Sequence, residues 1–255
     1  MDYSRYEQLD CRKSGSVLTV CLNRPDSLNA INAYLHTELS TLFADIAADQ
    51  SVNAVVLTGA GRAFSAGGDL EWFRSITPQQ VDELFVEARK IIIDLLELPQ
   101  PIVAAINGAA AGLGATLALF CDVIYASENA RISDPHVRVG VTAGDGGAVI
   151  WPLLVGPARA KEYLLTGDAV TAAEAERIGL INRVLSPEQL LPAATAMAER
   201  LASGPQKAIR STKASVNKIL RDTANLVLDT SLAFEKECFF SKEHKDAIQA
   251  FSDKR

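Results

Sequence analysis

The stretch Pro101-Ile102-Val103-Ala104-Ala105-Ile106-Asn107-Gly108-Ala109-Ala110-Ala111-Gly112-Leu113-Gly114 passes from apolar residues through a turn signal into a row of small residues. The apolar run over 101–106 predicts a short buried strand. Asn107-Gly108 predicts a turn, and the small residues after it open a short helix that reaches Phe120. A strand that leads through a turn into a helix is the unit of an α/β fold.

The same alternation continues on both sides of this stretch, and it predicts a mixed α/β core. Predicted strands cover 16–22, 53–58, 122–126 and 180–184, and predicted helices cover 32–48, 78–98, 157–165 and 171–178. From Pro187 onward the pattern is helical, with a break at Gly204-Pro205. We therefore expect a core of residues 1–204 and a helical C-terminal region, residues 205–255, that packs on the core or on a partner subunit.

Composition excludes several classes of protein. The chain has 255 residues, 48% of them hydrophobic and 22% charged, with a net charge of −6, which is typical of a globular enzyme and not of a nucleic-acid binder. No apolar run reaches the roughly 18 residues of a membrane span, and residues 1–7 lack an apolar signal core. Four widely spaced cysteines indicate no disulfide framework and favour a cytoplasmic protein, and three scattered histidines predict no metal site.

Two turns rich in small residues are candidates for ligand binding, Ser65-Ala66-Gly67-Gly68-Asp69 and Ala110-Ala111-Gly112-Leu113-Gly114. Such turns expose backbone N–H groups, and two of these groups that converge would stabilise a negative oxygen. A third glycine is missing after Gly114, and neither turn ends in Gly-Lys-Ser/Thr, so dinucleotide and phosphate loops are excluded. Two ordinary tight turns remain the alternative.

His136 and Asp145 are the best clue to chemistry, because a histidine beside a carboxylate transfers protons near neutral pH. The alternatives are a hydrogen-bonded loop histidine and an aspartate that caps a helix beginning at Gly146. Asp69 is expected to cap the helix that follows it, and His36 to be a surface or core residue, since no partner for it is evident.

These residues resemble the enoyl-CoA hydratase/isomerase (crotonase) superfamily along nearly the whole chain. The matching segments are Leu22-Asn23-Arg24-Pro25, Leu28-Asn29-Ala30, Val56-Leu57-Thr58-Gly59, Phe64-Ser65-Ala66-Gly67-Gly68-Asp69-Leu70, Ala104-Ala105-Ile106-Asn107-Gly108, Cys121-Asp122 and Gly179-Leu180-Ile181-Asn182-Arg183-Val184. The resemblance implies a crotonase-like spiral of ββα units, a helical C-terminal trimerisation region and acyl-CoA substrates. It also implies a homotrimer or a dimer of trimers, with no bound cofactor and with coenzyme A as part of the substrate.

The resemblance also assigns site residues. The backbone N–H groups of Gly68 and Leu113 would form an oxyanion hole for the thioester oxygen. Residues expected to contact coenzyme A are Arg62, Ala63, Ala66, Phe251 and Lys254, although the last two also fit a frayed charged tail. Residues that can line an acyl pocket are Trp72, Phe73 and Trp151, although aromatic residues are more often part of the core.

The chain departs from the hydratases at the two catalytic glutamates, whose positions are held by Thr116 and His136. A threonine hydroxyl is a poor proton acceptor, so ordinary two-glutamate hydration is not expected. The resemblance instead predicts an acid/base pair in which Asp145 orients the His136 imidazole and stabilises its protonated form.

Three hypotheses follow. His136 and Asp145, followed by Trp151-Pro152, are similar to the superfamily's carbon–carbon hydrolases of cyclic diketones, which work without coenzyme A. The retained segment Ala66-Gly67-Gly68-Asp69 instead favours a lyase or isomerase of a CoA thioester. A non-catalytic acyl-CoA-binding protein that has lost its glutamates is the third hypothesis.

Overall fold

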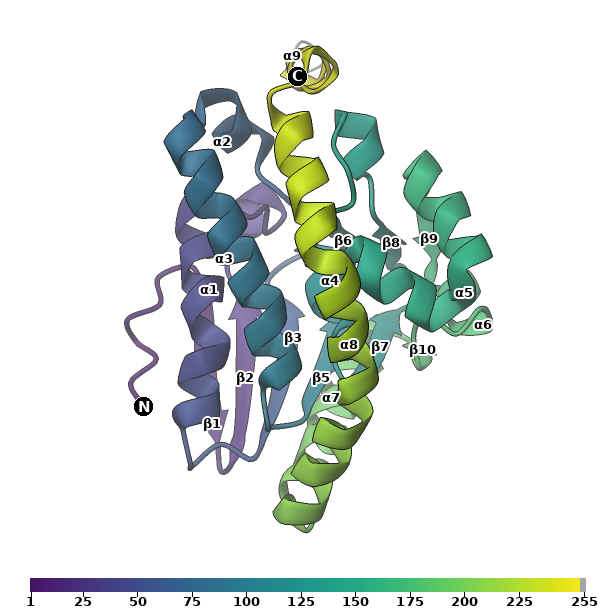
Figure 1. Cartoon of the computed structure of the whole chain (residues 1–255). Coiled ribbons are helices and arrows are strands. Elements are labelled where there is room, and N and C mark those ends of the chain that lie inside the picture. Colours follow the sequence, from purple (N-terminus) through teal and green to yellow (C-terminus); the bar gives the residue numbers. More distant parts are fainter. Residues whose placement is uncertain (253–255) are drawn as a thin grey trace.

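The computed structural model describes the backbone of residues 1–252 and the side chains of residues 1–250, and it contains two sheets flanked by helices (Figure 1). The larger sheet has the strand order β1-β2-β3-β5-β7-β10. Its strands are parallel, except that β1 pairs with β2 in the antiparallel direction. The strand bounds are β1 Leu9–Ser14, β2 Val17–Leu22, β3 Ala54–Gly59, β5 Ile102–Ile106, β7 Val123–Ser127 and β10 Arg183–Leu185.

Helices cover both faces of this sheet, as a largely parallel sheet requires. On one face lie α1 (Ala33–Ala48), α3 (Pro78–Glu97) and α8 (Gln206–Phe239), and on the other lies α7 (Pro187–Ala202) (Figure 1). Successive side chains of the strands point to opposite faces, so Val55 and Leu57 join the α1/α3 core whereas Ala54 and Val56 pack with α7.

The second sheet consists of very short strands, in the order β4-β6-β8-β9. Its strands are β4 Ala63–Ser65, β6 Ala109–Ala111, β8 Arg131–Ser133 and β9 Val170–Thr171. None of them was predicted, because two or three residues are too few to show a strand periodicity. The strand β1 was missed as well, since its mostly exposed edge carries polar and charged residues.

The two sheets are built from one repeated unit. In each repeat one strand joins the larger sheet, the next strand joins the smaller sheet, and a helix follows: β3-β4-α2, β5-β6-α4 and β7-β8-η2. The helices not yet given are η1 Pro25–Ser27, α2 Leu70–Ser75, α4 Leu113–Leu119, η2 His136–Val139, α5 Gly147–Thr166, α6 Ala172–Arg177 and α9 Lys242–Ser252. The predicted spiral of ββα units is confirmed.

Local signals set the helix boundaries. The Asn32 side chain accepts the N–H of Leu35 at the start of α1, and Thr77 forms a capping box with Gln80 at the start of α3. Helix α5 begins earlier than predicted, at Gly147, and contains a kink at Gly156, whose φ is 79°. The predicted helix over 157–165 started too late, because the kink at Gly156 separates two apolar segments and only the second was recognised as helical.

The helical C-terminal region packs back on the core of its own chain. Leu228, Leu232 and Phe239 of α8 are buried in the same hydrophobic cluster as α1, α3 and α5, and Figure 1 shows α8 running beside α3. Within residues 1–252, no helix has the length and apolar character needed to cross a membrane.

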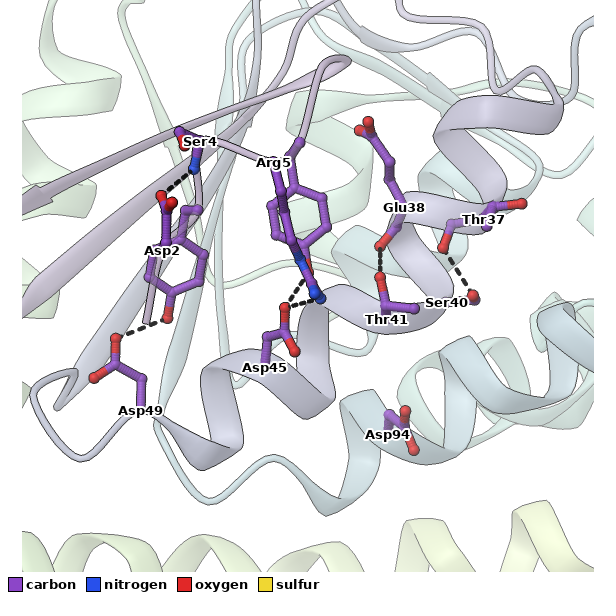
Figure 2. A network of polar contacts seen from close by, with 12 residues as sticks. Asp2, Ser4, Arg5, Thr37, Glu38, Ser40, Thr41, Asp45, Asp49 and Asp94 are labelled. Atoms are coloured by element: carbon purple, nitrogen blue, oxygen red, sulfur yellow. Dashed lines mark hydrogen bonds and ion pairs between the residues drawn. The ribbon is translucent and has the colours of Figure 1, made fainter.

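Polar contacts hold the N-terminal segment against α1 (Figure 2). The Tyr3 hydroxyl donates to Asp49 at 3.1 Å, and the Tyr6 hydroxyl donates to Asp45 at 2.6 Å. Arg5 also binds Asp45. These contacts secure the C-terminal half of α1, whose other half contributes His36 to the cavity described below.

Candidate active site

The register of the small sheet brings the predicted site segments together. Strands β4, β6 and β8 are parallel, with Ser65 opposite Ala110 and Ala111 opposite Ser133. Their carboxyl ends therefore lie at one edge of the sheet. Gly68 follows β4, Leu113 follows β6 and His136 follows β8.

The first turn is fixed by its backbone neighbours. Ile31 donates its N–H to the Gly67 carbonyl at 2.7 Å, and Asp69 donates its N–H to the Ile31 carbonyl at 2.9 Å. The Ser65 hydroxyl accepts the N–H of Gly67 at 3.2 Å and donates to the Asn29 carbonyl at 2.8 Å. The N–H of Gly68 takes part in none of these backbone hydrogen bonds.

The second turn depends on Gly112, whose φ of 49° and ψ of −128° favour glycine. Leu113 is the first residue of α4, where the N–H has no partner within the helix. The two turns touch, since an added Cβ on Gly67 would lie 2.8 Å from the Ala111 carbonyl oxygen. Gly68 and Leu113 both line the same cavity.

That cavity has a volume of about 750 Å³ and contains most of the predicted site. The predicted residues that line it are Arg62, Ala66, Gly68, Trp72, Phe73, Leu113, His136 and Asp145. Mostly apolar side chains from α2, α3, α8 and α9 complete the wall, among them Leu84, Ala88, Phe239 and Ala247. Such a space suits an apolar chain beside a few polar groups.

Two predicted contacts lie elsewhere. Trp151 is fully buried in the core beside Tyr163, with ring centroids 5.8 Å apart, because α5 turns this face toward the protein interior. Ala63 is buried in β4, where its carbonyl accepts from Asn29 and Asn107. Lys254 and the side chain of Phe251 lie outside the described residues.

His136 is held by Asp134, a residue that the sequence analysis did not single out. The Asp134 carboxylate is fully buried and binds Nδ1 of His136. An added Cβ on Gly147 would lie 1.9 Å from Asp134 Oδ2, so glycine is required there for the carboxylate to fit. The orientation of the ring, predicted as the role of Asp145, therefore depends on Asp134. The spacing of these two residues in Asp134-Pro135-His136 is the feature of the sequence from which their contact could have been predicted.

Asp145 contacts the other ring nitrogen. Its Oδ2 lies 3.3 Å from His136 Nε2, and its Oδ1 accepts the hydroxyl of Thr116 at 3.2 Å. The structure thus brings the predicted pair together and places the Asp145 carboxylate between Thr116 and His136. The helix-capping alternative is wrong, because Gly146 is the N-cap of α5 and no side chain caps it.

A third carboxyl group completes the cluster. Glu235 of α8 lines the cavity, is 5% exposed, and places Oε1 at 3.6 Å from His136 Nε2. Sequence reasoning missed Glu235 because nothing near it in the chain indicates that the helix reaches the site. Ligand atoms of Asp134, His136 and Asp145 lie within 4.8 Å of one another, but the two aspartates face different ring nitrogens.

The surroundings of His136 shift its pKa. Burial alone would lower the pKa of the imidazole, but the charges and hydrogen bonds of Asp134 and Asp145 outweigh burial and raise the pKa well above its ordinary value. Burial raises the pKa of Glu235 well above its ordinary value, and although His136 lowers it, the charges of Asp145 and Asp134 raise it further. The cluster therefore carries protons at neutral pH.

Two further residues differ in role. His36 is buried, lines the cavity and places Nδ1 at 2.7 Å from Glu87 Oε2, so it has a partner that the sequence did not reveal. Asp69 caps α2 by accepting the N–H of Glu71 at 3.2 Å, as predicted, and it also pairs with Arg24 at 3.1 Å.

Known proteins share this fold and much of this sequence. The family described as enoyl-CoA hydratase/isomerase matches residues 12–255. A short-chain-enoyl-CoA hydratase of Clostridium acetobutylicum is 37% identical over 248 residues, which are 95% of this chain and 94% of that protein.

Solved structures agree with this match. An enoyl-CoA hydratase/isomerase from Mycobacterium paratuberculosis has a TM-score of 0.94 and 37% identity, covering 97% of this chain and 100% of that one. A beta-diketone hydrolase from the cyanobacterium Anabaena, bound to (S)-3-oxocyclohexyl acetic acid, has a TM-score of 0.86 and 30% identity, covering 93% of this chain and 96% of that one. The chain belongs to the enoyl-CoA hydratase/isomerase family.

Proposed function

We propose that the protein is a lyase or isomerase of acyl-CoA thioesters, in which a His136–Asp145 pair takes the place of the usual glutamates. The observation that carries this proposal is the contact of Asp145 with His136 Nε2 at 3.3 Å, in the cavity that Gly68 and Leu113 also line. The enzyme needs no cofactor besides the coenzyme A carried by its substrate.

The proposed mechanism begins at the thioester carbonyl. The N–H groups of Gly68 and Leu113 hold its oxygen as negative charge develops, and one such donor typically contributes about 100- to 1000-fold in rate. The Asp145 carboxylate accepts a proton from the carbon next to the carbonyl, and His136 Nε2, kept protonated by Asp134 and Asp145, supplies one. The pair thus moves protons in both directions beside the enolate.

The cavity supports a CoA substrate in two further ways. Arg62 is exposed and lines the cavity, where its charge suits the phosphates of coenzyme A, and Ala66 is an exposed residue of the same cavity. Trp72 and Phe73 form an apolar wall for the acyl chain, with ring centroids 5.3 Å apart. We propose that the protein is a cytoplasmic homotrimer or dimer of trimers. Apolar side chains of α8 that are exposed in the single chain favour contact with another subunit, namely Val216, Ile219, Leu226 and Phe234.

A panel of enoyl-CoA thioesters tests the proposal. We expect wild-type turnover, and a loss of about 100- to 10,000-fold in H136A, since a positioned proton-transfer group is worth that much. D145N should lose a similar factor, while exposed Asp168 provides a control, D168N, that keeps the rate. Unchanged turnover in H136A would show that His136 is not the acid/base group.

A second function is favoured by the same histidine. His136 lies among three carboxyl groups with Thr116 at a glutamate position, and the beta-diketone hydrolase is a near structural neighbour. We propose hydrolysis of a carbon–carbon bond in a diketone, independent of coenzyme A, as the competing function. Thermal stabilisation by coenzyme A, together with inactivity toward cyclic diketones, would reject it. A protein that binds coenzyme A but turns over no thioester would be the non-catalytic member.

A further inference from the structure

A second histidine lines the cavity, on a wall that the proposed pair does not use. His36 lies near the start of α1 and is 3% exposed, and its partner Glu87 lies on α3 between Leu84 and Ala88, which are buried and line the same cavity. Arg62, which also lines the cavity, is exposed. The cavity therefore has an open side at Arg62 and a closed wall formed by α1 and α3, and this wall carries one imidazole among apolar side chains.

Contacts with Glu87 and Trp72 fix the orientation of the His36 ring. Nδ1 lies 2.7 Å from Glu87 Oε2, and Glu87 Oε1 accepts the hydroxyl of Thr37 at 2.9 Å. The Trp72 indole packs against the imidazole, with ring centroids 5.8 Å apart. None of these contacts involves Nε2, for which the described residues provide no hydrogen-bond partner. Nε2 is not shielded from solvent either, so a molecule in the cavity can reach it.

The pairing with Glu87 determines what Nε2 can bind. A carboxylate only accepts hydrogen bonds, so Nδ1 of His36 carries a hydrogen and donates it to Glu87. Nε2 then accepts a hydrogen bond when the ring is neutral and donates one when the ring is protonated. A hydroxyl group pairs with Nε2 in both cases, because it both donates and accepts. A carbonyl oxygen pairs only with the protonated ring, and a methyl group pairs with neither form.

We propose that His36 is a specificity-determining residue that binds a hydroxyl group at the end of the acyl chain that meets the α1/α3 wall. The proposal rests on the acyl-CoA function above and names a subclass of substrate, acyl thioesters with a hydroxyl group at the far end of the chain. Trp72 and Phe73 contact the carbon chain, and Glu87 holds the imidazole so that Nε2 faces the hydroxyl group. No bond is made or broken at His36, which acts on binding alone.

Burial makes this contact selective. A hydroxyl group that enters an apolar wall without a partner loses its hydrogen bonds to water, and Nε2 of His36 loses its solvent when a methyl group covers it. A site that hydrogen-bonds a substrate hydroxyl therefore discriminates against the analogue that lacks it. We expect the wild-type protein to bind the hydroxylated thioester about 10-fold more tightly than the plain one.

Isothermal titration calorimetry with saturated thioesters tests the proposal, because a saturated chain binds without turnover. The probes are coenzyme A thioesters with a terminal hydroxyl group, from butanoyl to decanoyl, each paired with the plain thioester of equal length. Wild type should prefer the hydroxylated member at the chain length that reaches His36. H36F keeps a ring against Trp72 but removes both nitrogens, so the preference should reverse, since the hydroxyl group then has no partner.

A control variant and a second measurement accompany H36F. T37V is the matched control, because Thr37 adjoins His36 and also binds Glu87 but does not line the cavity, and it should keep the wild-type preference. Nitrogen NMR of labelled histidine in the wild-type protein covers the case in which H36F does not fold. The Nε2 resonance of His36 should shift with the hydroxylated thioester and stay in place with the plain one.

Equal affinities of wild type for both members of every pair would overturn the proposal, and so would an H36F variant that retains the wild-type preference. If no thioester of either series binds, the acyl-CoA function fails instead. Cyclohexanol and cyclohexane then replace the thioesters as probes of the cavity, and cyclohexanol alone should shift the Nε2 resonance. A resonance that moves with neither compound, or equally with both, would show that His36 binds no hydroxyl group.

Discussion

His136 is surrounded by more negative charge than one imidazolium neutralises. Asp134 faces Nδ1, while Asp145 and Glu235 face Nε2. Burial, followed by the charges of Asp145 and Asp134, raises the pKa of Glu235 well above its ordinary value, so this carboxyl group favours its protonated form. The arrangement keeps both a proton donor and a proton acceptor within reach of one cavity at neutral pH.

The first prediction at the residue scale concerns Asp134. In D134N the amide oxygen can still accept the Nδ1 hydrogen, but the charge that raises the pKa of His136 is gone. We expect kcat to fall about 10- to 100-fold with KM nearly unchanged, because the lost interaction acts on proton transfer rather than on binding. Steady-state kinetics across pH measures both constants.

The sign of the pH effect follows from the direction of the shift. Protonated His136 is lost as pH rises through its raised pKa, so the alkaline limb of the rate profile should move to lower pH in D134N. The ion pair stabilises the fold fully below the ordinary histidine pKa of about 6.5, and this contribution is lost as pH rises through the folded pKa. An alkaline limb that does not move would show that Asp134 does not control the charge of His136.

At the scale of elements, the site depends on short strands that end in glycine turns. Strands β4, β6 and β8 contribute little burial of their own, yet their parallel register aligns Gly68, Leu113 and His136. Glycine is required where the turns approach each other, at Gly67 and Gly112. The short strands therefore fix the positions of the Gly68 and Leu113 N–H groups.

The turn at Gly112 gives a prediction for an element. An alanine there would have a φ of 49°, and its Cβ would lie 3.4 Å from His136 Cε1. We expect G112A to lose about 1–3 kcal/mol of unfolding free energy, from backbone strain, together with about 10- to 100-fold of activity. Urea unfolding and turnover are the measurements.

G15A is the matched control, because Gly15 has a φ of 58° but no atom within 4 Å of an added Cβ, and it lies in the β1–β2 turn. It should lose stability to a similar extent and keep its turnover. If G112A loses no more activity than G15A, the second turn does not supply a catalytic donor.

At the scale of the whole molecule, α8 links the hydrophobic core to the site. Leu228 and Leu232 anchor the helix in the core, and the next turn carries Glu235 into the cavity. The predicted boundary at Gly204-Pro205 falls just before α8, yet the helix after it belongs to the same packed body as the core.

L228A tests this link. Leu228 is 1% exposed, so truncation should cost about 2–5 kcal/mol of unfolding free energy, as for other large-to-small core changes. Leu165 on α5 is 72% exposed, and L165A should change the free energy by less than about 0.5 kcal/mol. Equal effects in the two variants would mean that the burial of Leu228 does not stabilise the packing of α8 on the core.

The sequence by itself determined the strand–turn–helix alternation, the glycine turns at Gly68 and Gly112, and the pairing of His136 with Asp145. These are local patterns, and the order of the matching segments carried the family. The periodicity of a strand or helix depends on residues that are close in sequence, so it can be recognised from the sequence alone.

The tertiary structure alone decided which groups share the cavity. Trp151 lies outside the cavity because tertiary packing decides which side of α5 faces the protein interior. Glu235 reaches the cavity on a helix that begins far from His136 in sequence. The short strands β4, β6 and β8 of the small sheet form because segments distant in the sequence pair side by side. A contact between distant segments is fixed by the burial and register of the whole chain, which no local pattern encodes.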